Sequence, residues 1–158
     1  LAHDPHDGAV YVATFIDNLI RRVSKDGQVT TFVGDTKPGG ADGTGSDARF
    51  FGPVGIVYDS RDGNLYVTDS GNNAIRRITP QGVVTTLAGG SGVGSSDGVG
   101  SAASFYRPTG IAYDKDDDSL YVVDSGNALI RHVSMSGRVQ TLNVRCVDGP
   151  AVCWDASR

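Results

Sequence analysis

The densest group of residues with chemical potential is acidic. Asp114, Asp116, Asp117 and Asp118 all fall within the segment 114–118, and closely spaced carboxylate oxygens are the ligands that a hard cation such as Ca²⁺ prefers. A run of charge is also typical of a solvated turn between two strands. The sequence favours the solvated turn, and a weak calcium site at these four carboxylates is the alternative.

Two further acidic segments, Asp69–Asn73 and Asp124–Asn127, begin with the same order Asp-Ser-Gly-Asn. Their carboxylate and amide oxygens could also suit Ca²⁺. Asp and Asn side chains, however, commonly cap backbone groups in turns. Because the order recurs at one position of a repeating pattern, we expect a structural turn rather than a cation site.

The three histidines, His3, His6 and His132, are too scattered for a recognisable zinc motif. The chain also contains no Cys-x-x-Cys pair, no glycine-rich phosphate loop before a helix and no nucleophile elbow. The sequence therefore assigns no catalytic residue and no cofactor, and Ca²⁺ or Zn²⁺ remain only as alternatives.

The two cysteines, Cys146 and Cys153, flank an Asp-Gly-Pro turn near the end of the sequence. They could close a small disulfide loop, which would place the protein in an extracellular or lumenal compartment. Two free thiols are the other interpretation. The sequence leaves both open, and the compartment with them.

Arginine recurs at one register, as Arg21, Arg76 and Arg131. Stacked around a ring, these side chains could form a basic band that attracts phosphate. Asp69 and Asp124 precede two of them by the same interval, close enough in neighbouring strands to form ion pairs. The formal net charge is −4, so ion pairs are the favoured interpretation and nucleic acid is disfavoured.

The elements that position these residues form an internal repeat. Tyr11, Tyr66 and Tyr121 each begin a Tyr-Val pair and are spaced 55 residues apart, and 17 of the 32 positions from Ile56 to Leu87 are identical 55 residues later. The 22 glycines favour many short strands joined by tight turns. Such a fixed period is typical of stacked structural units.

Each unit contains four apolar or β-branched segments separated by turn residues. In the second unit they are Pro53–Asp59, Asn64–Asp69, Ala74–Ile78 and Val83–Leu87. Short connections make successive strands antiparallel neighbours and leave no room for helices. Both faces of this four-stranded sheet are apolar, so it must stack against others, as the blades of a β-propeller do.

The pattern resembles the NHL repeat. The resemblance lies in Pro53–Ile56, Gly63–Asn73 and Ile75–Ile78, and the third unit repeats it at Pro108–Ile111 and Leu120–Asn127. It implies an all-β propeller of three four-stranded blades, in units of about 1–50, 51–105 and 106–158. NHL rings resemble six-bladed closures, so three blades would be half of a ring or a fragment of a larger propeller.

The first unit starts at a position equivalent to Ile56 and lacks the Pro-x-Gly that opens the others. Three blades would leave two apolar sheet faces uncovered. We therefore expect either a piece of a longer chain or a half-propeller that closes its ring by homodimerisation.

Long connections at 34–49 and 88–104 share the pattern Asp-Gly-x-Gly-Ser-x-Ala-x-Phe. Connections of this length are usually functional unless they are packed down. Phe50 and Phe105 recur and are expected to anchor each connection against its blade, whereas Asp42 and Asp97 recur at its start. A structural role is favoured, with binding loops at these four residues as the alternative.

What the resemblance implies about activity is a binding or scaffold module that contacts a protein partner through its loops. One alternative is an enzyme of the lyase or lactonase type with a metal in the central channel, as in peptidylglycine-amidating lyases, which use histidine-bound zinc. Another is an RNA-binding NHL domain. The sequence favours the binding module over an enzyme, and no apolar stretch in it is long enough to span a bilayer.

Overall fold

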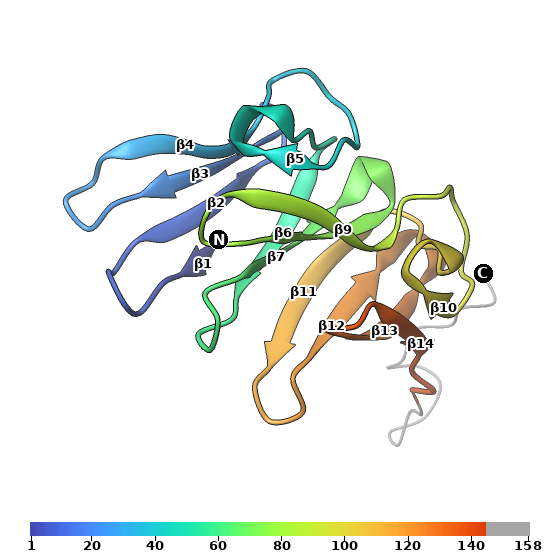
Figure 1. The fold of residues 1–158 in the computed structure, drawn as a ribbon. Coiled ribbons are helices and arrows are strands. Elements are labelled where there is room, and N and C mark those ends of the chain that lie inside the picture. Colours follow the sequence, from blue (N-terminus) through green and yellow to red (C-terminus); the bar gives the residue numbers. More distant parts are fainter. Residues whose placement is uncertain (145–158) are drawn as a thin grey trace, which may run out of the picture.

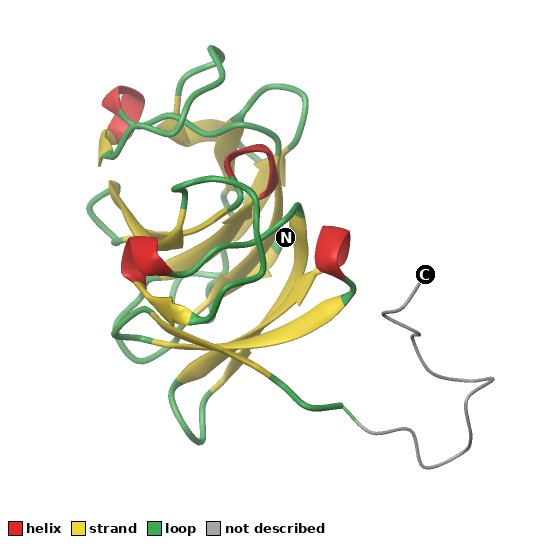
Figure 2. Cartoon of the chain, turned by 90° about the vertical axis from the view of Figure 1, so that its right-hand side faces the viewer, coloured by secondary structure: helices red, strands yellow, loops and turns green. Residues whose placement is uncertain are grey.

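The computed structural model describes residues 1–144, which form three antiparallel sheets arranged side by side (Figure 1). Within these residues, helix is limited to short 3-10 turns, and none is long or apolar enough to cross a membrane. Figure 2 shows the same arrangement from the side, with single helical turns between the strands. The predicted all-β propeller architecture is confirmed.

The first sheet, blade 1, has the strand order β1-β2-β3-β4. Its strands are β1 (Ala2–His3), β2 (Val10–Thr14), β3 (Leu19–Val23) and β4 (Val29–Gly34). Every neighbouring pair is antiparallel, as the short turns between the strands require.

The second and third sheets repeat this meander. Blade 2 contains β6 (Pro53–Tyr58), β7 (Leu65–Asp69), β8 (Ala74–Ile78) and β9 (Val83–Gly89). Blade 3 contains β11 (Pro108–Asp114), β12 (Ser119–Asp124), β13 (Leu129–Ser134) and β14 (Arg138–Thr141). The strands start within one residue of the positions predicted for the second unit.

Blades 2 and 3 each gain a fifth strand that the repeat pattern did not predict. The strand β5 (Gly43–Thr44) pairs with β9, and β10 (Gly98–Val99) pairs with β14. Each belongs to the long connection that leaves the preceding blade, followed by the 3-10 turns η1 (Gly45–Asp47) and η3 (Gly100–Ala102). The long connections therefore bind the outer edge of the next blade instead of forming free loops.

The core consists of apolar layers between neighbouring blades. Phe50 lies with Ile20 and Val84 between blades 1 and 2, and Phe105 lies with Ile75 and Leu120 between blades 2 and 3. Phe50 and Phe105 are completely buried. They anchor the connections, as predicted, but between two blades rather than against one, because the layer between stacked sheets is where apolar area is removed from water.

The innermost strands β6 and β11 approach closely. The Thr68 hydroxyl accepts a hydrogen bond from the Gly55 amide at 2.7 Å and donates one to the Thr109 carbonyl at 2.7 Å. A Cβ on Gly55 would lie only 2.3 Å from that carbonyl oxygen. Glycine is therefore required at this position by the close approach of the two backbones.

Candidate functional site

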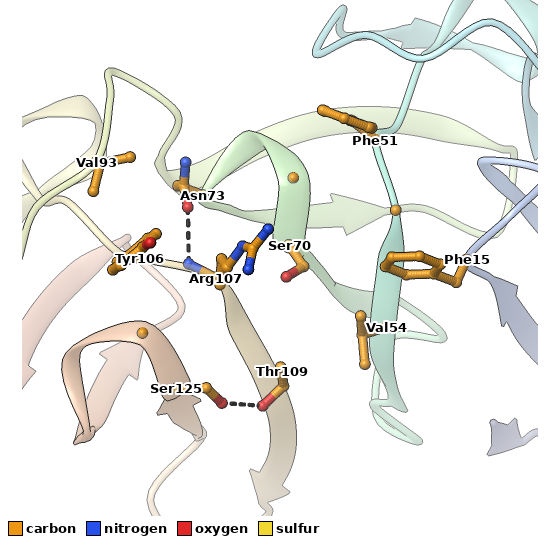
Figure 3. Close-up of a pocket in the computed structure, with 13 residues that line it drawn as sticks. Phe15, Phe51, Val54, Ser70, Asn73, Val93, Tyr106, Arg107, Thr109 and Ser125 are labelled. Atoms are coloured by element: carbon orange, nitrogen blue, oxygen red, sulfur yellow. Dashed lines mark hydrogen bonds between the residues drawn. The ribbon is translucent and has the colours of Figure 1, made fainter.

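An apolar groove of about 790 Å³ opens at the end of the molecule where β6 and β11 begin (Figure 3). Five large apolar side chains that are exposed in the described chain line it, namely Phe15, Phe51, Val54, Val93 and Tyr106. They come from a β2–β3 turn, from the segments that enter β6 and β11, and from the connection after β9. Such a concentration of exposed apolar side chains marks a binding surface.

Glycines in the neighbouring 3-10 turns let the two aromatic residues Phe51 and Tyr106 lie close to the backbone. In η2 (Ser70–Asn72), a Cβ on Gly71 would be 2.6 Å from the Phe51 ring, and in η4 (Ser125–Asn127), one on Gly126 would be 2.5 Å from the Tyr106 ring. The Gly71 amide also donates to the Phe51 carbonyl at 2.8 Å. The recurring Ser-Gly-Asn order is thus explained by close approach.

The Asp-Ser-Gly-Asn turns fix the same segments from below. Asp69 accepts hydrogen bonds from the Phe51 amide at 2.8 Å, from the Asn72 side chain at 2.7 Å and from the Arg76 guanidinium at 2.7 Å. Burial raises the pKa of Asp69, and these three donors oppose that effect. All of its contacts are with the chain itself, which supports the structural interpretation of this turn.

The third blade repeats the arrangement atom for atom. Asp124 accepts from the Tyr106 amide at 2.7 Å, from Asn127 at 2.7 Å and from Arg131 at 2.8 Å. The predicted ion pairs of the recurring arginines with the preceding aspartates are therefore confirmed in blades 2 and 3. In blade 1, Thr14 occupies the aspartate's position, and Arg21 instead bonds to Thr31.

Asp42 and Asp97, two of the predicted loop residues, lie against these same arginines. Arg76 donates to Asp42 at 2.8 Å, and Arg131 donates to Asp97 at 2.9 Å. Burial raises the pKa of Asp97, but hydrogen bonds from Thr141 and Arg131 outweigh it and leave that pKa lowered. The contacts of Asp42 and Asp97, together with the burial of Phe50 and Phe105, hold the long connections onto the blades.

The groove has one cationic side chain, Arg107, at the register that glycine occupies in blade 2. Arg107 has φ 53° and Gly52 has φ 57°, a left-handed conformation that costs a residue with a side chain about 1–2 kcal/mol. The Arg107 amide donates to Asn73 at 2.8 Å, as the Gly52 amide donates to Asn18 at 2.8 Å. The Asn contact stabilises the conformation at both positions, so an arginine can be held there.

Hydroxyl and amide groups complete the lining. Thr109 and Ser125 form a hydrogen bond with each other across the groove, and Ser70 lies on the neighbouring turn (Figure 3). Among the described residues that line the groove there is no histidine, cysteine or carboxylate. The lining can bind through apolar contact, hydrogen bonds and one positive charge, but it lacks a general acid or base.

The predicted acidic segment lies at the other end of blade 3, in the turn between β11 and β12. Its carboxylates are dispersed among separate partners. Asp116 contacts Lys115, Asp117 contacts Ser119 and His132, and Asp118 contacts Arg61 and Tyr113; Asp114 accepts a hydrogen bond from the Asp116 amide at 2.9 Å. No group of three His, Cys, Asp or Glu side chains able to hold a metal ion occurs within residues 1–144.

The remaining predicted residues do not meet in the groove. His3 is on β1, His6 contacts Asp4 and Tyr58, and His132 is on β13. Cys146 and Cys153 lie outside the described residues.

Sequence reasoning missed the groove because it followed the residues that recur. Phe51 and Tyr106 each follow a buried phenylalanine directly, so one member of each pair must point away from the core. Adjacent aromatic residues at the start of a strand are the signal that could have identified them. Arg107 gave a second signal, since it replaces glycine at a repeating position.

Comparison with known families matches residues 50–78 and 105–133 to the NHL repeat. The two ranges begin at the anchoring residues Phe50 and Phe105 and end in β8 and β13. Blade 1, whose β2–β3 turn is the most divergent, lies outside the two matched ranges.

Among curated proteins, NHL repeat-containing protein 2 of Homo sapiens is 31% identical over 95% of this chain, and the protein of that name from Bos taurus is 30% identical over 96%. In both cases the match covers 23% of the relative. The chain therefore spans less than a quarter of the length of these relatives.

Among solved structures, an auxiliary nutrient binding protein from Bacteroides thetaiotaomicron superposes with a TM-score of 0.73 at 26% identity, covering 89% of this chain and 36% of that one. A virginiamycin B lyase from Staphylococcus aureus, solved with quinupristin, gives a TM-score of 0.61 at 23% identity, covering 88% and 39%. The second likeness shows the fold alone.

The repeat match, the relatives and the three stacked four-stranded meanders all agree. The chain belongs to the NHL-repeat family, and its described residues form three blades of a β-propeller.

Proposed function

We propose that this chain is a binding module that holds a segment of a protein partner in the groove. The observation that carries the proposal is the gathering of Phe15, Phe51, Val54, Val93 and Tyr106 at one end of the blades. The residues that recur in every blade are spent on the core and its ion pairs. The groove is built largely from positions where the blades differ, which is how a rigid repeat scaffold acquires specificity.

Two other functions have weaker support. A lyase or lactonase would need groups that move protons or hold a metal, and the groove's described lining offers hydroxyls, an amide and one guanidinium. An RNA-binding surface gains affinity from several phosphate contacts, whereas this groove contains one cation on a chain with a net charge of −4. A protein segment with apolar side chains fits the lining better.

The test is selection of binding peptides from a random library displayed on phage, with the unmodified chain as bait. Val54→Glu places a charge inside the groove, and Val83→Glu is its matched control, because the two valines are 39% and 38% exposed and Val83 lies on β9, outside the groove. We expect the chain and its Val83→Glu variant to enrich the same peptides and Val54→Glu to lose them. Peptides that bind all three forms equally, or no enrichment at all, would overturn the proposal.

A second proposal concerns the scaffold itself, and it follows from one face of blade 3. Ile75 in blade 2 is completely buried against blade 3, but Ile130, at the same position of blade 3, is only half-buried. It lines a hollow of about 310 Å³ together with Tyr121 and Val123. This face has the apolar character of a blade-to-blade contact without a blade on it.

Blade 1 presents the complementary face. Leu65 and Val67 of blade 2 are buried against blade 1, while Val10 and Val12, at the same positions of blade 1, are half-buried. We propose that a second copy of the chain covers both faces, with the blade 1 of each copy packing on the blade 3 of the other. Two such contacts related by a twofold axis would close a ring of six blades.

A further inference from the structure

The groove crosses two blade junctions, and the two have different chemistry. At the junction of blades 1 and 2, the Phe15 ring covers Gly52, where a Cβ would lie 2.9 Å from it. At the junction of blades 2 and 3, the corresponding residues are Ser70 and Arg107. A large ring beside a glycine is thus replaced by a small hydroxyl beside an arginine, so the groove is apolar at one end and cationic at the other (Figure 3).

The Arg107 guanidinium has no anionic partner in the described part of the chain. Arg22, Arg61, Arg76 and Arg131 each form a salt bridge, whereas none of the salt bridges or side-chain hydrogen bonds within residues 1–144 involves that guanidinium. The nearby carboxylates of Asp69 and Asp124 are committed to Arg76 and Arg131 beneath the groove. The formal charge at the groove is therefore positive and uncompensated.

The backbone of Arg107 shows that this cation occupies an unfavourable position. Its left-handed conformation, φ 53°, suits glycine, which blade 2 has at the same register. Non-glycine residues held in such conformations cluster at binding and active sites, where the surrounding structure enforces them. Here the Asn73 side chain enforces it through the Arg107 amide, and the side chain is left directed into the groove (Figure 3).

We infer that the partner segment carries a carboxylate, from Asp, Glu or a chain end, beside an apolar or aromatic side chain, with Arg107 binding the carboxylate and Phe15, Phe51 and Val54 contacting the apolar group. The inference rests on the proposed function of the groove. Arginine suits this role because its planar fork binds a carboxylate through two parallel hydrogen bonds. The charge complements a groove that is otherwise apolar, so the acidic group would also set the direction in which the segment lies.

The inference is tested on the peptides enriched by the selection described above. Each is synthesised with its acidic residue intact and with that residue changed to the corresponding amide, and binding is measured by fluorescence anisotropy. We expect the acidic form to bind about tenfold more tightly than the amide form, the difference that one charge-assisted contact supplies. Arg107→Gln should remove this preference and leave the affinity for the amide form unchanged.

Arg138→Gln serves as the matched control, since Arg138 is also an exposed arginine but lies on β14, outside the groove. It should retain the full preference for the acidic peptide. Enriched peptides without an acidic residue, or an acidic preference that survives in Arg107→Gln, would overturn the inference while leaving the proposed function intact. Peptides that bind Val54→Glu normally would instead overturn the proposed function.

A labelled oligouridylate provides the last arm of the test. Binding of this probe that requires Arg107 and weakens steeply with added salt would overturn the peptide inference in favour of a nucleic acid. We expect no binding at physiological ionic strength, because a single guanidinium releases too few counterions to supply useful affinity.

Discussion

The Arg76 guanidinium lies 2.7 Å from the Asp69 carboxylate, with both side chains buried. The same arginine donates to the backbone carbonyls of Arg49 and Ala41, at 2.9 and 3.0 Å, and lies over the Phe50 ring at 5.2 Å. One side chain therefore joins the turn of its own blade to the connection that arrives from the preceding blade. Because each bond has a counterpart around Arg131, the cluster acts as the joint between successive blades.

Arg76→Ala should lower the free energy of unfolding by about 3–5 kcal/mol, the cost of leaving a buried carboxylate without its partner. Arg21→Ala is the matched control, because blade 1 has Thr14 in place of the aspartate and the Arg21 side chain is 32% exposed. The control should cost less than about 1 kcal/mol. Urea denaturation followed by circular dichroism measures both, and equal losses for the two variants would show that the ion pair is not the joint.

Two neighbouring aromatic residues should have opposite roles. Phe105→Ala should destabilise the fold by about 3–5 kcal/mol, because the ring is completely buried between blades 2 and 3. Tyr106→Ala should cost less than about 1 kcal/mol, because that ring is 38% exposed in the groove. Thermal unfolding and peptide binding, measured on the same samples, should separate the two. A Tyr106→Ala variant with unchanged peptide affinity would remove this ring from the proposed site.

Ring closure by a second copy predicts a dimer that one charge can disrupt. Val123→Lys places an ammonium group on the uncovered face of blade 3, where burying it without a partner is costly. We expect sedimentation velocity to show a dimer for the unmodified chain and a monomer for this variant. Val83→Lys, on the outer part of blade 2, should stay dimeric. A soluble monomer of the unmodified chain at tens of micromolar would refute closure.

Tyr113 should make stability depend on alkaline pH. Burial, the largest cause, raises its pKa to about 12; Asp59 and Asp118 add to the rise, and Arg61 opposes it. A tyrosine whose pKa is higher in the folded state than in the unfolded state binds its proton more tightly when folded. Its contribution is therefore fully present below pH 10 and is lost as pH rises from 10 to 12.

The measurement is denaturant unfolding of the chain and of Tyr113→Phe at pH 8, 10 and 11.5. The variant should lose less stability than the unmodified chain between pH 10 and 11.5, because it has no phenol to ionise at this position. Ultraviolet titration of tyrosinate gives an independent check, since the variant should lack a component near pH 12. Parallel stability curves for the two proteins would contradict the raised pKa.

The sequence by itself determined the repeat, the strands and the pairing of recurring charges. The period of 55 residues, with alternating apolar residues and turn chemistry between them, leaves one solution for each unit, because local hydrogen bonding and the two-residue period of a strand suffice. Asp69 and Arg76 could be paired from sequence because both lie on consecutive strands of one meander. Such contacts depend on short connections, and short connections can be read from sequence.

The tertiary structure alone decided where each long connection goes and where the groove lies. Phe50 and Phe105 were recognised as anchors, but not that they lie between two blades and carry a fifth strand to the next sheet's edge. Phe15 and Val54 come from different blades, and Arg107 from a third. They share a surface only because the blades stack in one register, so the site arises from packing between units, which no property of a single unit specifies.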